Sequence, residues 1–164
     1  MLAQNLLSDW YNYKHGEMIE ERYPTNTWIV DDDSIYVYGL KKLISIKEIN
    51  TRLSHYSNGQ EAINALKATN EKHLLPDIIL LDINMPVMDG WEFMNEFAKL
   101  KPQTGKNITV YIMTPSLDLN DIYRAKNISE ITDYIFKPVK ASHVAEIFTP
   151  TLLQANEKIK QYGT

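Results

Sequence analysis

Short apolar runs alternate with amphipathic segments along most of this chain. Five runs rich in aliphatic and β-branched residues predict strands, at residues 27–30, 52–56, 77–81, 108–113 and 133–136. The segments between and after them have helix-like spacing and predict helices, at residues 34–46, 58–69, 89–100, 118–127 and 140–149. The second of these has a clear start, because Asn58 can cap it and Glu61 stands in capping-box position. Strands that alternate with helices indicate βα units and a parallel sheet.

Two of the predicted strands, at residues 77–81 and 108–113, are almost continuously hydrophobic. Strands of this kind are covered on both faces, as in the centre of an open sheet. We therefore expect an α/β fold, with a doubly wound sheet of five parallel strands and helices on both faces. Such sheets bind their ligands outside the carboxyl ends of the strands. Polar side chains at those ends are the first candidates for function.

The two ends of the chain lie outside this alternating pattern. Residues 1–24 are interpreted as an N-terminal helical extension, because they carry an apolar stripe at helical spacing, made by Leu2, Leu6, Trp10 and Tyr13. Residues 150–164 have a thinner apolar face and are interpreted as a C-terminal helical tail. The alternating domain then spans residues 25–149. Packing against this domain is the favoured role of both ends, ahead of binding a partner.

The composition is that of an ordinary soluble globular protein. A chain of 164 residues with 44% hydrophobic and 23% charged residues suits one domain with its own core. The net charge is −4 and the basic residues are scattered, so neither a nucleic-acid surface nor a membrane surface is expected. Cysteine is absent, which excludes disulfides, thiol catalysis and thiolate zinc sites. Without a signal peptide or a membrane-length apolar run, the expected location is cytoplasmic.

Acidic residues follow two of the predicted strands. Asp31, Asp32 and Asp33 come directly after the first strand, and Asp82 ends the third strand before a loop that contains Asn, Pro and Gly. Two unit charges about 4 Å apart repel by about 4 kcal/mol at an effective dielectric constant near 20. Carboxylates gathered at one sheet end therefore need a cation, and their oxygen ligands suit Mg²⁺. Acidic residues also begin helices and fill turns, so the Asp triplet alone is a weak indication.

Two further side chains strengthen the interpretation. Thr114 ends the fourth predicted strand with a hydroxyl group, and Lys137 ends the fifth with an ammonium group. An aspartate that accepts a phosphoryl group needs this combination. A metal ion screens the incoming charge, a hydroxyl group binds a phosphoryl oxygen, and a lysine balances the anion. The four histidines lack ligand spacing, and we expect them in surface or packing positions, at His15, His55, His73 and His143.

The chain closely resembles the response-regulator receiver domain of two-component signalling over about residues 26–149. Four segments carry the resemblance, namely Val30-Asp31-Asp32-Asp33, Leu81-Asp82-Ile83-Asn84-Met85-Pro86-Val87-Met88-Asp89-Gly90, Met113-Thr114 and Asp133-Tyr134-Ile135-Phe136-Lys137-Pro138. The Asp-x-x-Met-Pro-x-Met-Asp-Gly run is highly specific, and the Lys-Pro pair follows at the appropriate distance. The resemblance implies a flavodoxin-like receiver fold and a phosphoacceptor in a two-component phosphorelay.

The resemblance also implies a role for each acidic residue of the motif. Asp82 would accept a phosphoryl group from a sensor histidine kinase or a histidine-containing phosphotransfer protein. The implied ligands of Mg²⁺ are the side chains of Asp31, Asp32 and Asp82, together with the backbone carbonyl group of Asn84. Asn84 and Ser116 stand at the positions that tune hydrolysis of the acyl phosphate in this family, so the lifetime of the phosphate is expected to depend on them.

The remaining matches concern switching. Thr114 resembles the switch hydroxyl, Lys137 the lysine that pairs with the phosphate, and Tyr134 the aromatic residue that swings inward. The Lys137–Pro138 peptide is expected to be cis, as in the family. Phosphorylation is implied to shift the fourth strand and helix, so that a face built from the fourth helix, fifth strand and fifth helix meets a downstream target protein. A phosphorylation-dependent dimer fits the same scheme.

The chain departs from the family pattern at three places. Pro115 follows Thr114 where a small residue is usual, and it removes a backbone N–H that would otherwise contact the phosphoryl group. Lys140 occupies the cap position of the fifth helix and has no side-chain oxygen to cap it. The 24 residues at the N-terminus have no counterpart in a receiver domain.

Two other interpretations stay open. The first is a receiver-like interaction module that works without phosphorylation, which Pro115 favours and the complete set of site residues disfavours. The second is a phosphatase of the haloacid-dehalogenase type, with Asp31 of an Asp-x-Asp motif as nucleophile. That alternative leaves the loop after Asp82 unexplained. We expect no attached output domain, and no enzymatic activity beyond assisting its own phosphorylation and dephosphorylation.

Overall fold

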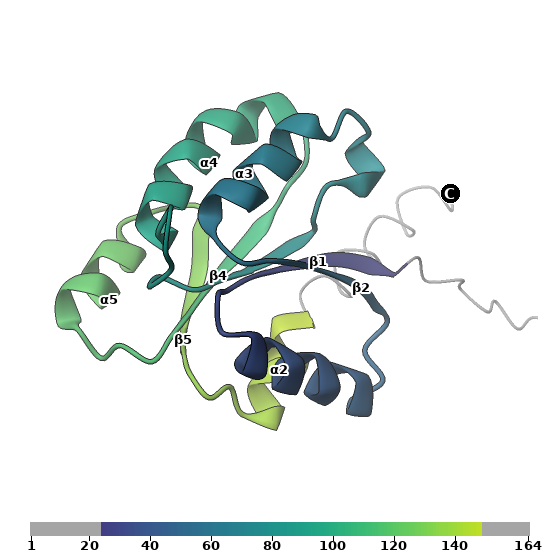
Figure 1. The fold of residues 1–164 in the computed structure, drawn as a ribbon, viewed down its shortest axis with the longest axis vertical. Helices are drawn as coiled ribbons and strands as arrows, with labels where there is room; N and C mark the ends of the chain where they lie inside the picture. The colour runs from purple at the N-terminus through teal and green to yellow at the C-terminus, as the bar shows by residue number, and fades with distance from the viewer. Residues whose placement is uncertain (1–23, 149–164) are drawn as a thin grey trace, which may run out of the picture.

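A five-stranded parallel sheet forms the centre of the molecule in the computed structural model, which describes residues 24–148 (Figure 1). The strand order is β2-β1-β3-β4-β5. The strands are β1 (Thr25–Val30), β2 (Thr51–Tyr56), β3 (Ile78–Leu81), β4 (Thr109–Thr114) and β5 (Ile131–Phe136). All five predicted strands are confirmed, with ends that differ by one or two residues.

The helices also fall where the hydrophobic spacing predicts them. They are α2 (Ser34–Ile46), α3 (Gly59–Ala68), α4 (Gly90–Thr104) and α5 (Leu119–Lys126), and residues 141–148 are helical as well. The sequence pattern did not predict the short 3₁₀ helix η1 (Lys72–Leu74). It also ended α4 at residue 100, whereas the helix continues to Thr104 and is closed by Gly105 in the left-handed conformation.

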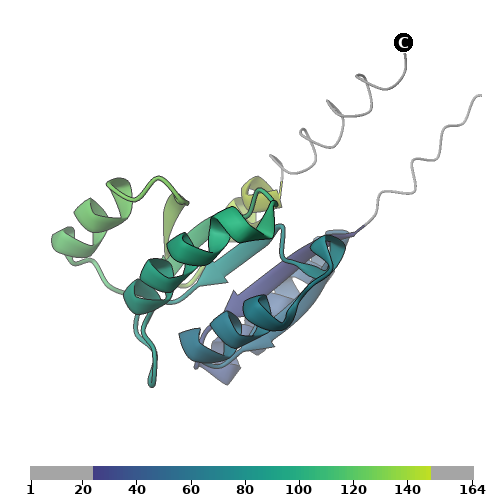
Figure 2. The same ribbon diagram turned by 90° about the horizontal axis from the view of Figure 1, so that it is seen from above.

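The two faces of the sheet are covered by different helices. Alternate residues of each strand point to opposite faces, so Trp28 and Val30 pack with α3 and α4, while Ile29 between them packs with α2 and residues 141–148. Figures 1 and 2 show α3 and α4 on one side of the sheet and α2 on the other. Every residue of β3 is buried. The predicted doubly wound α/β fold is confirmed.

Side chains fix the starts of the helices beside the carboxyl ends of the strands. The Asp33 carboxylate accepts hydrogen bonds from the first backbone N–H groups of α2. Asn58 caps α3 as expected, although the Glu61 carboxylate accepts from the Ser57 N–H and the Asn58 side-chain amide rather than from the Asn58 backbone N–H. A complete capping box starts α4, where Asp89 is the cap residue.

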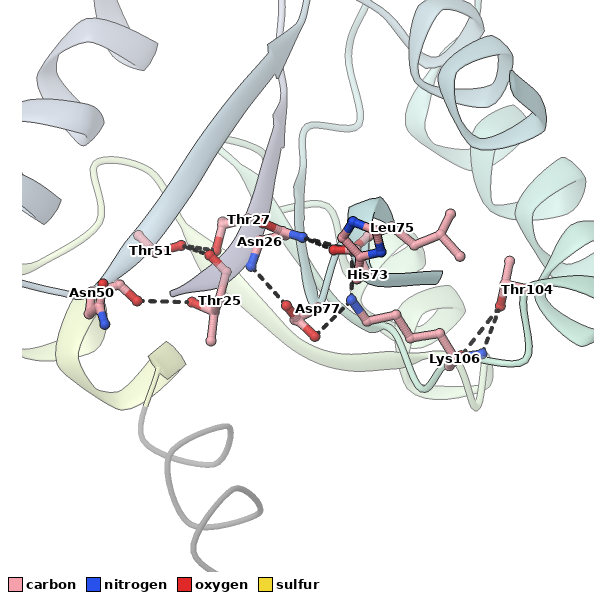
Figure 3. A network of polar contacts seen from close by, with 10 residues as sticks. All are labelled: Thr25, Asn26, Thr27, Asn50, Thr51, His73, Leu75, Asp77, Thr104 and Lys106. Atoms are coloured by element: carbon pink, nitrogen blue, oxygen red, sulfur yellow. Dashed lines mark hydrogen bonds and ion pairs between the residues drawn. The ribbon is translucent and has the colours of Figure 1, made fainter. Parts of the chain in front are cut away.

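A polar network ties the strands together at the opposite, amino-terminal end of the sheet (Figure 3). One oxygen of Asp77 accepts from the Asn26 N–H at 2.8 Å, and the other pairs with Lys106 Nζ at 2.9 Å. Lys106 Nζ also donates to the Leu75 carbonyl at 2.6 Å, and the Asn26 side chain donates to the His73 carbonyl at 2.6 Å. These contacts hold the segment before β3 against the start of β1 and the loop before β4.

The predicted helical extension at residues 1–24 and the predicted tail at residues 150–164 lie, apart from Pro24, outside the described residues. Both stay predictions. In the part of the chain that the structure describes, no helix has the length and apolar character that a membrane crossing requires.

Candidate functional site

The strand order brings the two acidic clusters together. β1 and β3 are neighbours, with Val30 paired to Leu81 in the register, so Asp31 and Asp82 follow side by side. The Asp82 N–H donates to the Val30 carbonyl at 2.9 Å, which fixes the backbone where both strands end. After β1 the chain turns toward β2, and it later returns on the other side through β3. The site therefore lies where the strand order reverses, the usual ligand position in this class of sheet.

Three carboxylates meet at this edge, as the sequence predicts. One oxygen from each of Asp31, Asp32 and Asp82 lies within 4.8 Å of the others, and Asp31 and Asp82 are buried whereas Asp32 is exposed. With the Lys137 ammonium group beside them, the cluster keeps a formal charge of two negative units. Hard oxygen donors with this charge fit a divalent ion such as Mg²⁺. Asp33 lies outside the cluster because its carboxylate caps α2.

Lys137 reaches the same cluster from the end of β5. Its Nζ atom lies 2.6 Å from Asp31 Oδ2 and 3.1 Å from Asp82 Oδ2, and only 10% of its side chain is exposed. The Lys137 N–H donates to the Thr114 carbonyl at 3.0 Å, which anchors the start of the loop. The Lys137–Pro138 peptide is cis, so that expectation is confirmed.

Burial dominates the electrostatics of Asp82. Desolvation raises the pKa of its carboxyl group above the usual value, the Lys137 ammonium group lowers it, and the Asp31 carboxylate raises it. The backbone N–H of Ile83 donates to Asp82 Oδ1 at 2.8 Å and also favours the ionised form. One lysine thus offsets only part of the cost of burying this charge, and a second cation would favour ionisation further.

Thr114 and Tyr134 lie in a connected group at the ends of β4 and β5. Thr114 is fully buried, and its Oγ1 accepts from the Ser116 N–H at 3.2 Å. Tyr134 is half-buried and its hydroxyl group donates to the Ser116 carbonyl at 3.1 Å. Burial, and then the carboxylate of Asp121, raise the pKa of Tyr134. Pro115 lies between Thr114 and Ser116 in this turn, and its side chain is exposed.

The same turn is joined to two helices. Ser116 Oγ donates to one oxygen of Asp121 in α5 at 3.5 Å, and the Trp91 indole N–H of α4 donates to the other at 3.0 Å. The Arg124 guanidinium group lies 4.5 Å from the centre of the Trp91 ring. The sequence did not predict a role for Asp121 or Trp91, because the spacing of residues along the chain does not show which side chains of separate helices come into contact.

The loop after Asp82 is shaped by two unusual backbone positions. A Cβ atom at Gly90 would collide with the Asp82 backbone carbonyl, so only glycine allows this close approach. Val87 has a φ of 70° and lies between Pro86 and Met88, whose carbonyl and N–H groups bond across it at 2.8 Å. Asn84 lies exposed in this loop, and its role as a carbonyl ligand stays a prediction.

Two further residues lie beside the cluster, and sequence reasoning missed the first of them. The Tyr36 ring in α2 lies under the Lys137 ammonium group, 4.5 Å from Nζ to the ring centre. Burial raises the pKa of Tyr36 to about 12, so the phenol is neutral at physiological pH. Its buried hydroxyl lies near the backbone of Val139 without a well-formed hydrogen bond. His55 Nε2 lies 2.9 Å from the Asp31 carbonyl oxygen, which agrees with a packing role.

Comparison with known proteins gives a consistent family. Residues 27–149 match the family described as the response regulator receiver domain. The response regulator protein VraR of Staphylococcus saprophyticus is 30% identical over 128 residues, which are 78% of this chain and 56% of that protein. The chain spans about half the length of the curated relatives of this kind that it matches. The haloacid-dehalogenase alternative is not retained.

Solved structures agree on the fold. A two-component response regulator from Cytophaga hutchinsonii has a TM-score of 0.69 and 26% identity, and the match covers 79% of this chain and 98% of that one. The receiver domain of a sensor histidine kinase from Pseudomonas aeruginosa, solved with magnesium coordinated in its active-site cleft, has a TM-score of 0.62 and 18% identity, with coverages of 77% and 96%. This chain belongs to the response regulator receiver domain family of two-component systems.

Proposed function

We propose that Asp82 of this receiver domain accepts a phosphoryl group and that Asp31, Asp32, Thr114, Lys137 and Tyr134 serve this reaction. The observation that carries the proposal is the position of Lys137 Nζ, which contacts both Asp31 and Asp82 in a buried site. A lysine in this position can neutralise a phosphoryl oxygen as the group arrives. The raised pKa of Asp82 indicates that its charge is poorly solvated and available as a nucleophile.

The transfer forms one bond and breaks another. An Asp82 carboxylate oxygen attacks the phosphorus of a phosphohistidine, the new O–P bond forms, and the N–P bond breaks with its electron pair returning to the imidazole. Lys137 pairs with a phosphoryl oxygen, and the Thr114 hydroxyl group donates to another. When bound by Asp31, Asp32, Asp82 and the Asn84 carbonyl group, Mg²⁺ would supply charge neutralisation for the phosphoryl oxygens.

The partners in this proposal are of two kinds. Receiver domains interact with histidine kinases or phosphotransfer proteins, and a protein of this class is the proposed donor for this chain. The proposed output is a face on α5, β5 and residues 141–148, where exposed apolar side chains are available for a target protein or a second copy, including Leu119, Tyr123 and Phe136. Movement of Thr114 would reach this face through Ser116 and Asp121.

The test is incubation with acetyl phosphate and Mg²⁺, followed by measurement of the intact mass. We expect the wild-type protein to gain one phosphoryl group and Asp82→Asn to gain none. Asp89→Asn is a matched control, because it makes the same change in the same loop and asparagine also caps helices well. It should gain the group as the wild type does. The absence of a mass increase in the wild type would favour an interaction module that works without phosphorylation.

A further inference from the structure

The Lys137 ammonium group has three neighbours among residues 24–148, and it carries three N–H donors. Two of the neighbours are carboxylate oxygens, of Asp31 at 2.6 Å and of Asp82 at 3.1 Å. The third is the ring of Tyr36, whose centre lies 4.5 Å from Nζ. A lysine ammonium group carries three N–H bonds and accepts none. The aromatic ring therefore takes the place of a third hydrogen-bond acceptor in a site from which water is largely excluded.

We propose that Tyr36 is a positioning residue that holds the Lys137 ammonium group for phosphoryl transfer, an inference that rests on the proposed function of Asp82. A cation is attracted to the face of an aromatic ring without being neutralised. A third carboxylate would also attract the lysine, but it would add a negative charge that repels the incoming phosphoryl group. The ring gives the attraction without that repulsion.

The contact matters most when Asp82 reacts. Once an Asp82 oxygen is bonded to phosphorus, the ammonium group has to pair with a phosphoryl oxygen instead of that carboxylate. Lys137 then keeps two of its three original neighbours, Asp31 and the Tyr36 ring. Since Tyr36 lies in the first turn of α2 and Lys137 follows β5, the ring joins two elements that approach the site from different strands. The lysine is thus held in place while its partner changes.

Packing is the competing explanation for Tyr36, because its ring also contacts the core on the α2 side of the sheet. Two substitutions separate the two roles. Tyr36→Phe keeps the aromatic face and removes only the hydroxyl group. Tyr36→Leu keeps an apolar side chain for packing and removes the aromatic face. Tyr38→Leu is a matched control, because Tyr38 lies in the same helix, is 71% exposed and takes part in none of the contacts described for the site.

The experiment uses the full chain with isotope-labelled lysine and has two measurements. The first is the NMR shift of the Lys137 Hε protons without any ligand, which a ring face displaces upfield. The second is the affinity for beryllofluoride in the presence of Mg²⁺, which mimics a phosphoryl group on Asp82. Thermal unfolding of each variant shows whether it is folded at the temperature of both measurements.

We expect the upfield shift in the wild type, Tyr36→Phe and Tyr38→Leu, and its loss in Tyr36→Leu. Beryllofluoride affinity should fall roughly threefold to thirtyfold in Tyr36→Leu, the range of a cation–π contact from exposed to desolvated sites. It should stay within about twofold in Tyr36→Phe and Tyr38→Leu, less than the weakest such contact.

Three outcomes would overturn the inference. Wild-type affinity in Tyr36→Leu would show that the ring does not position the lysine. Equal losses in Tyr36→Phe and Tyr36→Leu would assign the effect to the hydroxyl group. No upfield shift in the wild type would mean that the contact itself is absent. A wild-type protein that shows the shift but binds no beryllofluoride would instead overturn the proposed function of Asp82. The contact between Tyr36 and Lys137 would then exist without a role in phosphoryl transfer.

Discussion

Asp82 is a buried carboxylate whose surroundings disfavour its charge. Burial raises its pKa, Asp31 adds to the effect, and Lys137 compensates only in part. A buried carboxylate of this kind destabilises the folded state while it is ionised, and any added positive charge nearby stabilises its ionised form. The reactive group of the proposed site is therefore held in a state that a metal ion and a phosphoryl-binding lysine both relieve.

This imbalance predicts how stability depends on pH. Between the ordinary carboxyl pKa of about 4 and the raised pKa of Asp82, the folded protein binds more protons than the unfolded chain, so stability falls as pH rises through that window. Asp82→Asn lacks this cost and keeps an oxygen for the Ile83 N–H. Without Mg²⁺, its free energy of unfolding should exceed that of the wild type near neutral pH.

Urea unfolding of the two proteins at several pH values checks this prediction. The difference should shrink as the pH falls from the raised pKa of Asp82 toward about 4, and it should level off below that, where the carboxyl group is protonated in both the folded and the unfolded state. A difference that is the same at neutral and acid pH would show that the substitution acts through packing. A less stable Asp82→Asn at neutral pH would mean that Lys137 more than compensates the burial.

The residues of the site differ in how well they could be predicted. Asp31, Asp82 and Thr114 follow strongly hydrophobic strands, so the sequence places them at one edge of the sheet. Lys137 was found by its position after the fifth strand. Tyr36 could not be found, because an aromatic residue in a helix is most often a packing residue and nothing in the spacing names Lys137 as its partner.

At the scale of elements, the loop between β3 and α4 holds a strained position. Val87 has a φ of 70° and is the centre of a γ-turn, a conformation that is rare for residues with a Cβ branch. The side chain is 80% exposed and gains little from packing. Such a position costs of order 1–3 kcal/mol for a residue other than glycine.

Replacing this valine by glycine should stabilise the protein. Val87→Gly removes the strain, which stabilises the folded state. Glycine also gives the unfolded chain more conformational freedom, but the free-energy cost of that freedom is smaller than the strain removed, so the free energy of unfolding should rise by about 1 kcal/mol. For a chain of this length, that raises the melting temperature by about 2–4 °C. Thermal unfolding gives the answer directly.

Leu117→Gly serves as the comparison for that substitution, because Leu117 is 73% exposed in a loop and has no positive φ. Glycine there only adds freedom to the unfolded chain and should lower the melting temperature. If Val87→Gly lowers it as well, the valine conformation is not strained.

The boundaries of the elements show where local signals end. Hydrophobic runs located the strands to within two residues, because the central strands are buried on both faces. The end of α4 depends on Gly105 and on a helix that continues past Pro102, and a residue near a proline gives no clear helical signal. The bridge from Ser116 through Asp121 to Trp91 depends on how α4 and α5 pack, which no local pattern contains.

At the scale of the whole molecule, the two ends of the sheet have different roles. The amino-terminal edge is closed by the hydrogen bonds and the ion pair of Asp77 and Lys106 (Figure 3). The carboxyl-terminal edge gathers like charges with one lysine among them. The fold follows from the alternation of strands and helices, and it places Asp31 beside Asp82 because β1 and β3 are neighbours.

The proposed function requires that the carboxylate at position 82 carries the phosphoryl group. Treatment of the phosphorylated protein with borohydride reduces an acyl phosphate of aspartate to homoserine, which tandem mass spectrometry of the peptides locates. We expect homoserine at position 82 in the wild type, only after incubation with acetyl phosphate and Mg²⁺. Homoserine at position 31 or 32 instead, or at no position in a protein that has gained the mass of a phosphoryl group, would contradict it.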